Sequence, residues 1–386
     1  MPRFTVDLIR NHAMKRLWTR LSRKQILFYI LGLLCLCLAI TFTSHDAFLY
    51  KKPLAEVIKI KTVKTKQIDA NHSKDALFSQ KITAKMKNGK YKGQLIHLTN
   101  QYSQSGAYDQ KYGEGNTLFV SIESHGHHKL GGTITGAKRD KPIVIIVGLF
   151  LFVLLAIGKR QGLYSIISLF INIVLLLVAL NLFLDFQQSS LLLVGMGAVV
   201  LFTVISLLLV SGRQEKTYVA IIATLISTFV ALLIAYAALK LTDSNGLHFE
   251  SMQFVLIPPQ EVFMAQILIG SLGAVMDLAI TLTSSVYELY EKSETLSRKA
   301  LMRSGREIGG DVMGAMTNIL FFAYISGTIP IILLYLKNGY PLIDTFSLNL
   351  SLELVRALAG SIGIVLTIPI TLYLSMLFIF RKEKRT

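Results

Sequence analysis

The chain has 386 residues, of which 52% are hydrophobic, and its mean hydropathy is +0.53. This composition excludes an ordinary soluble domain and indicates an α-helical membrane protein that crosses the bilayer several times. The net charge of +17 does not indicate nucleic-acid binding, because the positive residues lie in tails, short loops and one polar domain. Cys35 and Cys37 are the two cysteines, and their spacing places them on different faces of a helix. We therefore expect neither a disulfide nor a metal-binding cysteine pair, and no cofactor.

Residues 1–24 form a basic tail, and an uncharged run follows at residues 25–43. A basic segment before an apolar run is also typical of a signal peptide. This run is longer than a usual signal-peptide core, and no clear small-residue cleavage site follows it. The pattern predicts an uncleaved transmembrane helix.

Residues 44–141 are predicted to form a small β-rich domain. The segment VIKIKTVKTKQI alternates apolar and polar residues, and KITAKMKNGKYKGQLIHLTN resembles two strands around an Asn88-Gly89 turn. The run TLFVSI follows a further glycine-marked turn. Short strands with glycine turns favour a small barrel or sandwich, and an OB-like barrel is one such form. No acidic or cysteine partner stands at a fixed spacing from the histidine cluster, which favours a solvated loop over a metal site: His125, His127 and His128.

Residues 142–380 are predicted to form a membrane domain of seven helices, which with residues 25–43 makes eight in total. The runs have about the length that a helix needs to cross a bilayer. They are Ile143–Gly158, Leu163–Leu184, Ser189–Gly212, Thr217–Leu239, Val262–Val286, Val312–Leu336 and Ala357–Phe380. Residues 381–386 form a short basic tail.

The distribution of lysine and arginine predicts the orientation in the membrane. With the N-terminus in the cytoplasm, the inner segments hold 20 of these residues, and the short outer loops hold three. These three are Lys240, Lys337 and Arg356. Because positive residues collect in cytoplasmic loops, we expect both termini inside and the β-rich domain outside.

Two polar faces stand out on successive predicted helices. On the segment that contains Asp277, polar and small residues recur at steps of three and four, so they share one helix face: Gly270, Gly273, Ala274, Asp277, Thr281 and Ser284. On the next segment a second face carries Asp311, Gly314, Ala315 and Asn318. The small residues, which are Gly270, Gly273, Ala274, Gly314 and Ala315, would allow the two helices to approach closely.

A carboxylate inside a membrane helix is costly and marks a candidate functional site. At about 1.5 Å per residue, Asp277 lies near the middle of the bilayer, Asn318 lies nearby and Asp311 lies at the cytoplasmic mouth. These residues, with Thr281 and Ser284, are predicted to line a polar path that opens to the cytoplasm. In the alternative interpretation, Asp277 and Asn318 bond to each other and only hold the helices together. The loop between the helices, residues 288–310, has acidic residues followed by basic ones, which fits a short cytoplasmic helix. The alternative is a segment that lies along the anionic inner leaflet of the membrane.

The blocks GSLGAVMDLAITLTSSVYEL and SGREIGGDVMGAMTNILFFAYISGTIP resemble the characteristic blocks of the YibE/F family of bacterial multi-pass membrane proteins. The resemblance extends over most of residues 141–380, and the polar segment from Asn88 is similar to the outer domain of Gram-positive members. Gly310 stands where the family tends to have a charged residue. The resemblance implies a bacterial cell-membrane location, a permease or transport-associated role, and a related membrane protein as a partner.

Three functions remain open. The first is a transporter or permease component, and the second is a sensor, scaffold or envelope-assembly protein that acts through its outer domain. The third, an intramembrane aspartyl protease, is disfavoured: the G-x-G-D motif lacks its first glycine at Ile308, and the depths of Asp277 and Asp311 differ by about 15 Å. We therefore expect no enzyme, no catalytic residue and no bound metal. The sequence does not identify a solute, and it has no nucleotide-binding loop pattern.

Overall fold

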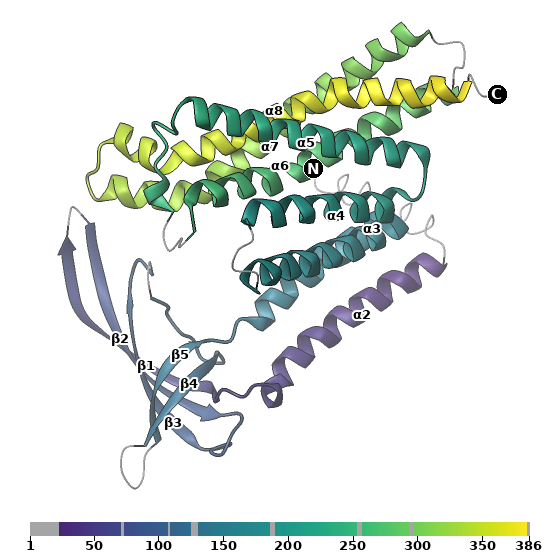
Figure 1. Ribbon diagram of the computed structural model, residues 1–386. Helices are drawn as coiled ribbons and strands as arrows, with labels where there is room; N and C mark the ends of the chain where they lie inside the picture. Colours follow the sequence, from purple (N-terminus) through teal and green to yellow (C-terminus); the bar gives the residue numbers. More distant parts are fainter. Residues whose placement is uncertain are drawn as a thin grey trace, which may run out of the picture. The chain divides into compact units, whose positions relative to one another are not determined.

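The computed structural model describes residues 23–70, 73–106, 109–124, 130–185, 190–252, 257–292 and 297–383. The chain divides into two compact units, Met1–Gly162 and Leu163–Thr386, and each is described by itself (Figure 1). The predicted histidine cluster and the greater part of the N-terminal tail lie outside the described residues.

The first unit begins with helix α2 at Arg23–His45 and a short 3-10 turn, η1, at Asp46–Leu49. The strands are β1 (Leu54–Ala70), β2 (Ser73–Met86), β3 (Leu95–Ser103), β4 (Thr117–Ser124) and β5 (Leu130–Ala137). Helix α3 follows at Asp140–Asp185 and crosses the boundary between the units. The second unit continues with α4 (Leu191–Ser211), α5 (Glu215–Leu241), η2 (Phe249–Ser251), α6 (Pro259–Lys292), α7 (Arg298–Lys337) and α8 (Leu342–Glu383).

The prediction of eight separate membrane helices is wrong, because the described residues contain seven helices that are long and apolar enough to cross a membrane. The runs that were expected to form two helices, around Lys159, belong to the 46-residue helix α3. Lys159 has non-helical dihedral angles, with φ 47° and ψ −119°. A Cβ atom at Gly162 would clash with the carbonyl oxygen of Leu154, although eight residues of straight helix span about 12 Å. Helix α3 therefore bends sharply at Lys159 instead of ending in a loop.

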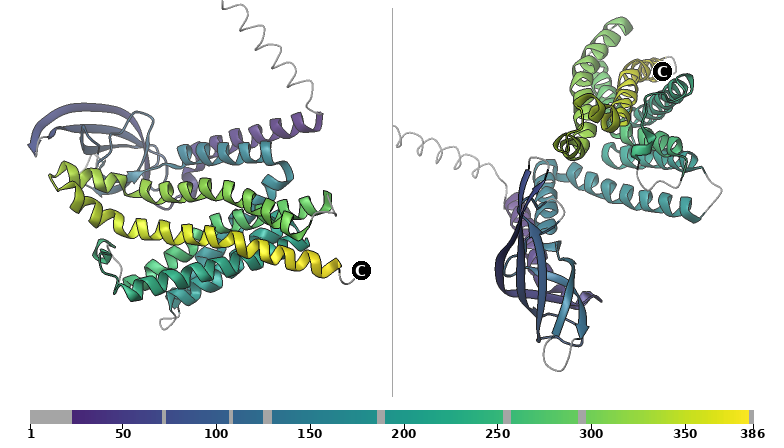
Figure 2. Two further views of the ribbon diagram at one scale, coloured as in Figure 1. Left: turned by 90° about the horizontal axis from the view of Figure 1, so that it is seen from above. Right: turned by 90° about the vertical axis from the view of Figure 1, so that its left-hand side faces the viewer.

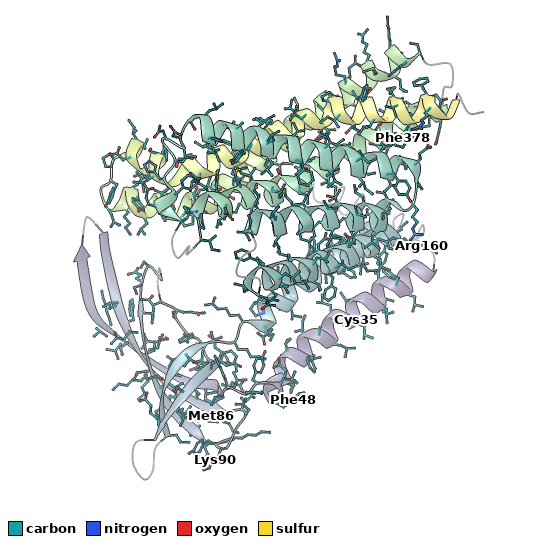
Figure 3. The ribbon with its side chains drawn as sticks, viewed as in Figure 1. Cys35, Phe48, Met86, Lys90, Arg160 and Phe378 are labelled. Atoms are coloured by element: carbon teal, nitrogen blue, oxygen red, sulfur yellow. The ribbon has the colours of Figure 1, made fainter. Side chains whose placement is uncertain are left out.

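The five strands close into a small barrel, which confirms the predicted β-rich domain. The strand order is β1-β2-β3-β5-β4, with β4 pairing back to β1 and with β3 and β5 parallel, as in an OB-type barrel. Buried and exposed residues alternate along β3, so one face of each strand fills the interior. Met86, Ile82 and Ile96 are among the fully buried side chains of this core. The right-hand view of Figure 2 shows the strands curling around one another, and Figure 3 labels Met86 in the barrel and Lys90 in the β2–β3 turn.

Asn88 fixes the segment that joins α2 to the barrel. Its side-chain oxygen accepts a hydrogen bond from the backbone N–H of Leu54 at 2.7 Å. Its side-chain nitrogen lies 3.0, 2.9 and 3.0 Å from the carbonyl oxygens of Ala47, Tyr50 and Lys52. Asn88 is only 8% exposed, so these polar groups have little access to water. The residue that the sequence marks as part of a turn therefore also holds the linker in place.

Asn88→Ala should lower the free energy of unfolding of the first unit by about 2–4 kcal/mol, because several buried backbone groups would lose their partner. This change is measured by thermal unfolding of the full chain in detergent, with protease cleavage within the barrel as the readout. Asn116→Ala is the matched control, since Asn116 is exposed and accepts one short-range bond from Gly113. Equal effects of the two substitutions would contradict the assigned role of Asn88.

An ionic network ties the end of α2 to the start of α3. Lys138 forms a buried ion pair with Asp46 and donates to the carbonyl oxygen of Thr43 at 2.6 Å. Its Nζ also lies 3.6 Å from a carboxylate oxygen of Asp140. Tyr50 donates a hydrogen bond to Asp140, which raises the pKa of the Tyr50 hydroxyl to about 12. Both chain connections of the barrel are thus held together on the membrane-helix side.

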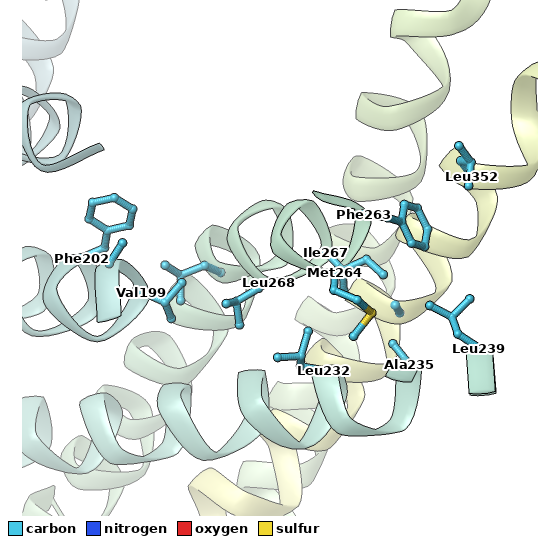
Figure 4. Close-up of a cluster of buried hydrophobic side chains, with 13 residues drawn as sticks. Val199, Phe202, Leu232, Ala235, Leu239, Phe263, Met264, Ile267, Leu268 and Leu352 are labelled. Carbon is cyan, nitrogen blue, oxygen red and sulfur yellow. The ribbon is translucent and has the colours of Figure 1, made fainter. Parts of the chain in front are cut away.

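In the second unit, α6 is the central helix. It packs against α4, α5, α7 and α8, while α8 also packs against α5 and α7. Figure 2 shows α7 and α8 running side by side. A buried apolar cluster joins α4, α5, α6 and α8, and it includes Val199, Leu232, Phe263, Leu268 and Leu352 (Figure 4).

Close approach of the membrane helices takes place at glycines of α7 and α8. A Cβ atom at Gly360 would contact Leu320 of α7 and lie 3.2 Å from Ser271 of α6. One at Gly363 would lie 3.2 Å from Val275. Lipid surroundings give little hydrophobic drive for helix association, so such close packing stabilises the bundle.

Candidate functional site

The polar face of α6 points away from the core of the second unit. Asp277 lies on the opposite side of the helix from Val275 and Leu282, which are both fully buried. Asp277, Gly273 and Thr281 are exposed, whereas Ser284 is half-buried. Within the described part of the chain, the Asp277 carboxylate makes neither a hydrogen bond nor an ion pair. One face of α6 thus carries the Asp277 carboxylate, the Thr281 hydroxyl and the exposed backbone at Gly273.

The polar face of α7 also points outward. Asp311 and Asn318 are exposed and lie on the opposite side of the helix from Leu320, which is buried against α8. Gly314 and Ala315 are exposed on the same side. No hydrogen bond joins Asn318 to Asp277 among the described residues. The alternative in which these two residues bond directly is therefore not the arrangement seen in this conformation.

The contact between Gly270 and Tyr324 sets the relative register of α6 and α7. A Cβ atom at Gly270 would clash with the Tyr324 hydroxyl, so these two positions are level. Because the two helices run antiparallel, Asp277 is level with about residue 317, close to Asn318 in height. Asp311 then lies roughly 9 Å further along the axis toward the connecting loop. This separation does not favour two carboxylates that share a proton.

The small residues predicted to bring α6 and α7 together have different surroundings. Gly270 contacts Tyr324, but a Cβ atom at Gly273 or Gly314 would meet no described atom within 4 Å. Ala274 belongs to the periphery of a buried cluster. Helix α8 packs against both α6 and α7, and its Gly360 is one of the points where all three helices meet. Gly360 and Gly363, which the sequence prediction did not include, were the available sequence signal for this packing of α8.

The predicted charged loop at residues 288–310 is replaced largely by helix ends. Helix α6 continues to Lys292, and α7 begins at Arg298 with Ser297 as its N-cap. The expected separate cytoplasmic helix is therefore wrong for the described residues, because the charged segments extend the two membrane helices. Residues 293–296 lie outside the described part of the chain.

Arg356 was assigned to a loop from the sequence, but it lies inside α8 and forms a polar cluster with α6 and α7. Its guanidinium donates to Glu353 and to Gln266, at 2.5 Å in each case. The guanidinium carbon lies 5.6 Å from the ring centre of Phe263 and 5.4 Å from that of Tyr324. The Arg356 side chain is only 12% exposed. Glu353 and Arg356, three residues apart just before an apolar run, were the available sequence signal.

Two donors of this cluster lack acceptors. The Nε atom of Arg356 and the hydroxyl of Tyr324 are buried and have no hydrogen-bond partner among the described residues. Buried polar groups normally find partners, so the cluster is incompletely satisfied in this conformation. Among the same residues, no three His, Cys, Asp or Glu side chains gather to hold a metal ion.

The barrel carries a second polar surface, on the outward side of β1, β2 and β3. Lys61 and Lys81 stand directly opposite each other in the β1–β2 ladder, and both are exposed. Lys59 and Lys85 extend the basic surface along the same strands, next to His97 of β3. Like charges placed opposite each other destabilise a sheet, so this arrangement is unusual for a purely structural face.

Comparison with known protein families gives two matches. Residues 48–137 match the YibE/F family N-terminal domain, and residues 146–381 match the YibE/F-like protein family. The first match covers the barrel, and the second covers most of α3, all of α4–α7 and α8 except for its last two residues. No curated protein and no solved structure matches the chain.

Proposed function

This chain belongs to the YibE/F family, and we propose that it is a permease or transporter component of the bacterial cell membrane. The observation that carries the proposal is the exposed position of Asp277 in the middle of a membrane-length apolar helix. A carboxylate at the bilayer centre costs about 2.5–3.5 kcal/mol on insertion scales. Such a residue therefore faces a water-filled path or a protein partner. In this proposal Gly273, Asp277 and Thr281 line the path, and Ser284 extends it toward the Lys292 end.

Asp311 and Asn318 form the second wall of the proposed path. Their face on α7 is polar, lined with small residues and uncovered by the described residues of the second unit. A related membrane protein of the same family is the proposed partner that covers this face. Its helix would approach at Gly314 and Ala315, where small side chains permit close packing.

The proposed orientation places both chain ends in the cytoplasm and the barrel outside. Lysine and arginine are concentrated in the segments assigned to the inside. Arg356 lies within α8, and Lys240 and Lys337 lie in the last turns of α5 and α7, at the ends that lead into the outer connections. Helix α3 spans about 69 Å if straight, against about 30 Å of hydrocarbon, and its bend at Lys159 allows it to enter and leave on the same side.

Fusion reporters test this orientation. A fluorescent protein fused after Thr386 should fold and fluoresce, whereas alkaline phosphatase at the same site should be inactive. A phosphatase inserted in the β2–β3 turn at Lys90 should be active. The reverse pattern would overturn the assigned sidedness.

Transport itself is tested with the full chain in proteoliposomes on a solid-supported membrane. A panel of organic acids, amino acids, inorganic anions and divalent cations is applied as concentration jumps, with and without a proton gradient. At least one class should evoke a current that saturates with concentration. The absence of current for every class, with and without a co-reconstituted family member, would contradict the proposal.

The second candidate is a sensor or envelope-assembly role through the barrel, and the opposed pair Lys61 and Lys81 favours it. The basic face would bind an anionic partner outside the membrane. A chain that lacks residues 48–137 but retains the membrane helices separates the two functions. If this chain keeps its solute current but fails to restore the phenotype of a deletion strain, the binding role gains support.

A further inference from the structure

The Arg356 cluster stands at one end of the polar face of α6. Gln266, which binds Arg356, lies 11 residues before Asp277, and this spacing is about three turns of helix. Gln266 and Asp277 therefore share a face. Arg356 itself comes from α8, so the guanidinium lies across the end of this face instead of extending it.

Tyr324 of α7 closes the same end from the other side. Its hydroxyl lies against the backbone of Gly270, and its ring stacks on the guanidinium of Arg356. One turn further along α8, Leu320 and Ser271 fill the space beside Gly360. By contrast, the next position along the face, Gly273, has open space around it. On the polar face of α6, α7 is thus in contact on the Pro259 side of Gly273, at Gly270, and no described atom lies within 4 Å of a Cβ at Gly273 itself.

The contacts of this cluster are strong but incomplete. A charged hydrogen bond, an amide hydrogen bond and two aromatic rings hold Arg356. The unpartnered Arg356 Nε and Tyr324 hydroxyl nevertheless leave two donors without acceptors. A partly satisfied polar network is less firmly fixed than a complete one. A second arrangement that supplies acceptors for these two donors would offset part of the cost of leaving the first.

We propose that Arg356 and Tyr324 form a barrier at the Pro259 end of the polar face, so that Asp277 is reached only from the Lys292 end. The inference rests on the proposed function, since it assumes that the polar face of α6 is hydrated. In the proposed orientation, the structure is closed to the outside and open to the cytoplasm. Arg356 is then a gating residue, and the ion pair with Glu353 holds it in the closed position.

Cysteine labelling in vesicles tests this barrier. The reporter is Gly273→Cys in a chain with Cys35→Ser and Cys37→Ser, because a side chain at residue 273 meets no described neighbour. A membrane-impermeant maleimide is added to right-side-out and to inside-out vesicles. The reporter should react in inside-out vesicles and remain protected in right-side-out vesicles.

Tyr324→Ala should increase the labelling rate in right-side-out vesicles by about tenfold or more, because a minor open state is commonly populated below about 10%. Gly270→Ala should act in the same direction, since it displaces the Tyr324 hydroxyl without deleting any group. Phe322→Ala is the matched control, because Phe322 is 66% exposed and lies away from the cluster. Glu353→Gln should also increase outside labelling by releasing Arg356.

The outcomes separate the barrier from the path. Labelling from both sides in the unaltered background would overturn the barrier and leave the path intact. Labelling from neither side would overturn both, because the face would then be dry. An equal increase in Phe322→Ala and Tyr324→Ala would show general loosening and would also refute the barrier.

Discussion

Asp277→Asn should reduce the solute-evoked current of the reconstituted protein by about tenfold or more. The substitution keeps the size and shape of the side chain but removes the negative charge and the exchangeable acid. An exposed carboxylate halfway along α6 contributes to a path only through these two properties, and the bilayer makes its presence costly otherwise. The current in proteoliposomes, at matched protein density, provides the measurement.

Asp344→Asn is the control for this substitution. Asp344 is also exposed and helical, but it lies in the first turn of α8, far along that helix from Gly360. Its replacement should leave the current unchanged. Asp311→Asn and Asn318→Ala should give smaller reductions than Asp277→Asn, because they line the wall on α7. Full current in Asp277→Asn would remove this residue from the transport path.

Among substitutions that add a single methyl group to the barrel, Gly132→Ala should lower its stability the most. A Cβ atom at Gly132 would clash with the carbonyl oxygen of Ser121 and lie 3.2 Å from Ile96. The clash is with backbone of the adjacent strand, so it cannot be relieved by a side-chain rotation. We expect the free energy of unfolding of the first unit to fall by about 3 kcal/mol.

Gly136→Ala supplies the comparison for that change on the same strand, β5. A Cβ atom at Gly136 would meet nothing within 4 Å among the described residues, and replacing glycine in a strand reduces the entropy lost on folding. Its unfolding temperature should stay the same or rise slightly. Protease resistance of the barrel within the full chain reports both variants. Similar melting of the two would mean that the β4–β5 spacing adjusts more freely than the clash implies.

Hydrophobic length and strand alternation were enough to predict most of the elements. The apolar runs at Ile143 and beyond correspond to membrane helices, and the Asn88-Gly89 turn lies between β2 and β3 as expected. The break at Lys159 was visible as a charged pair, but charge alone does not distinguish a loop from a bend inside a continuous helix. The number of helices could therefore be established only from the backbone conformation at Lys159.

The candidate site was only partly predictable. Periodicity placed Asp277 and Thr281 on one face of α6, and the structure retains that arrangement. The periodicity of the sequence could not show that α8 would pack against both α6 and α7, since helix pairing depends on non-local contacts. For the same reason the sequence could not bring Arg356 to Gln266, which lies 90 residues earlier in the chain.

The hydrogen bonds of the Asn88 side chain have a mechanical consequence. The Asn88 side chain bonds to backbone groups along the segment from Ala47 to Leu54, so this segment is held against the β2–β3 corner. With Lys138 tied to the end of α2, both chain connections resist torque. A ligand that pulls on or rotates the barrel would therefore move the end of α2 together with it. The barrel would not move independently of this helix.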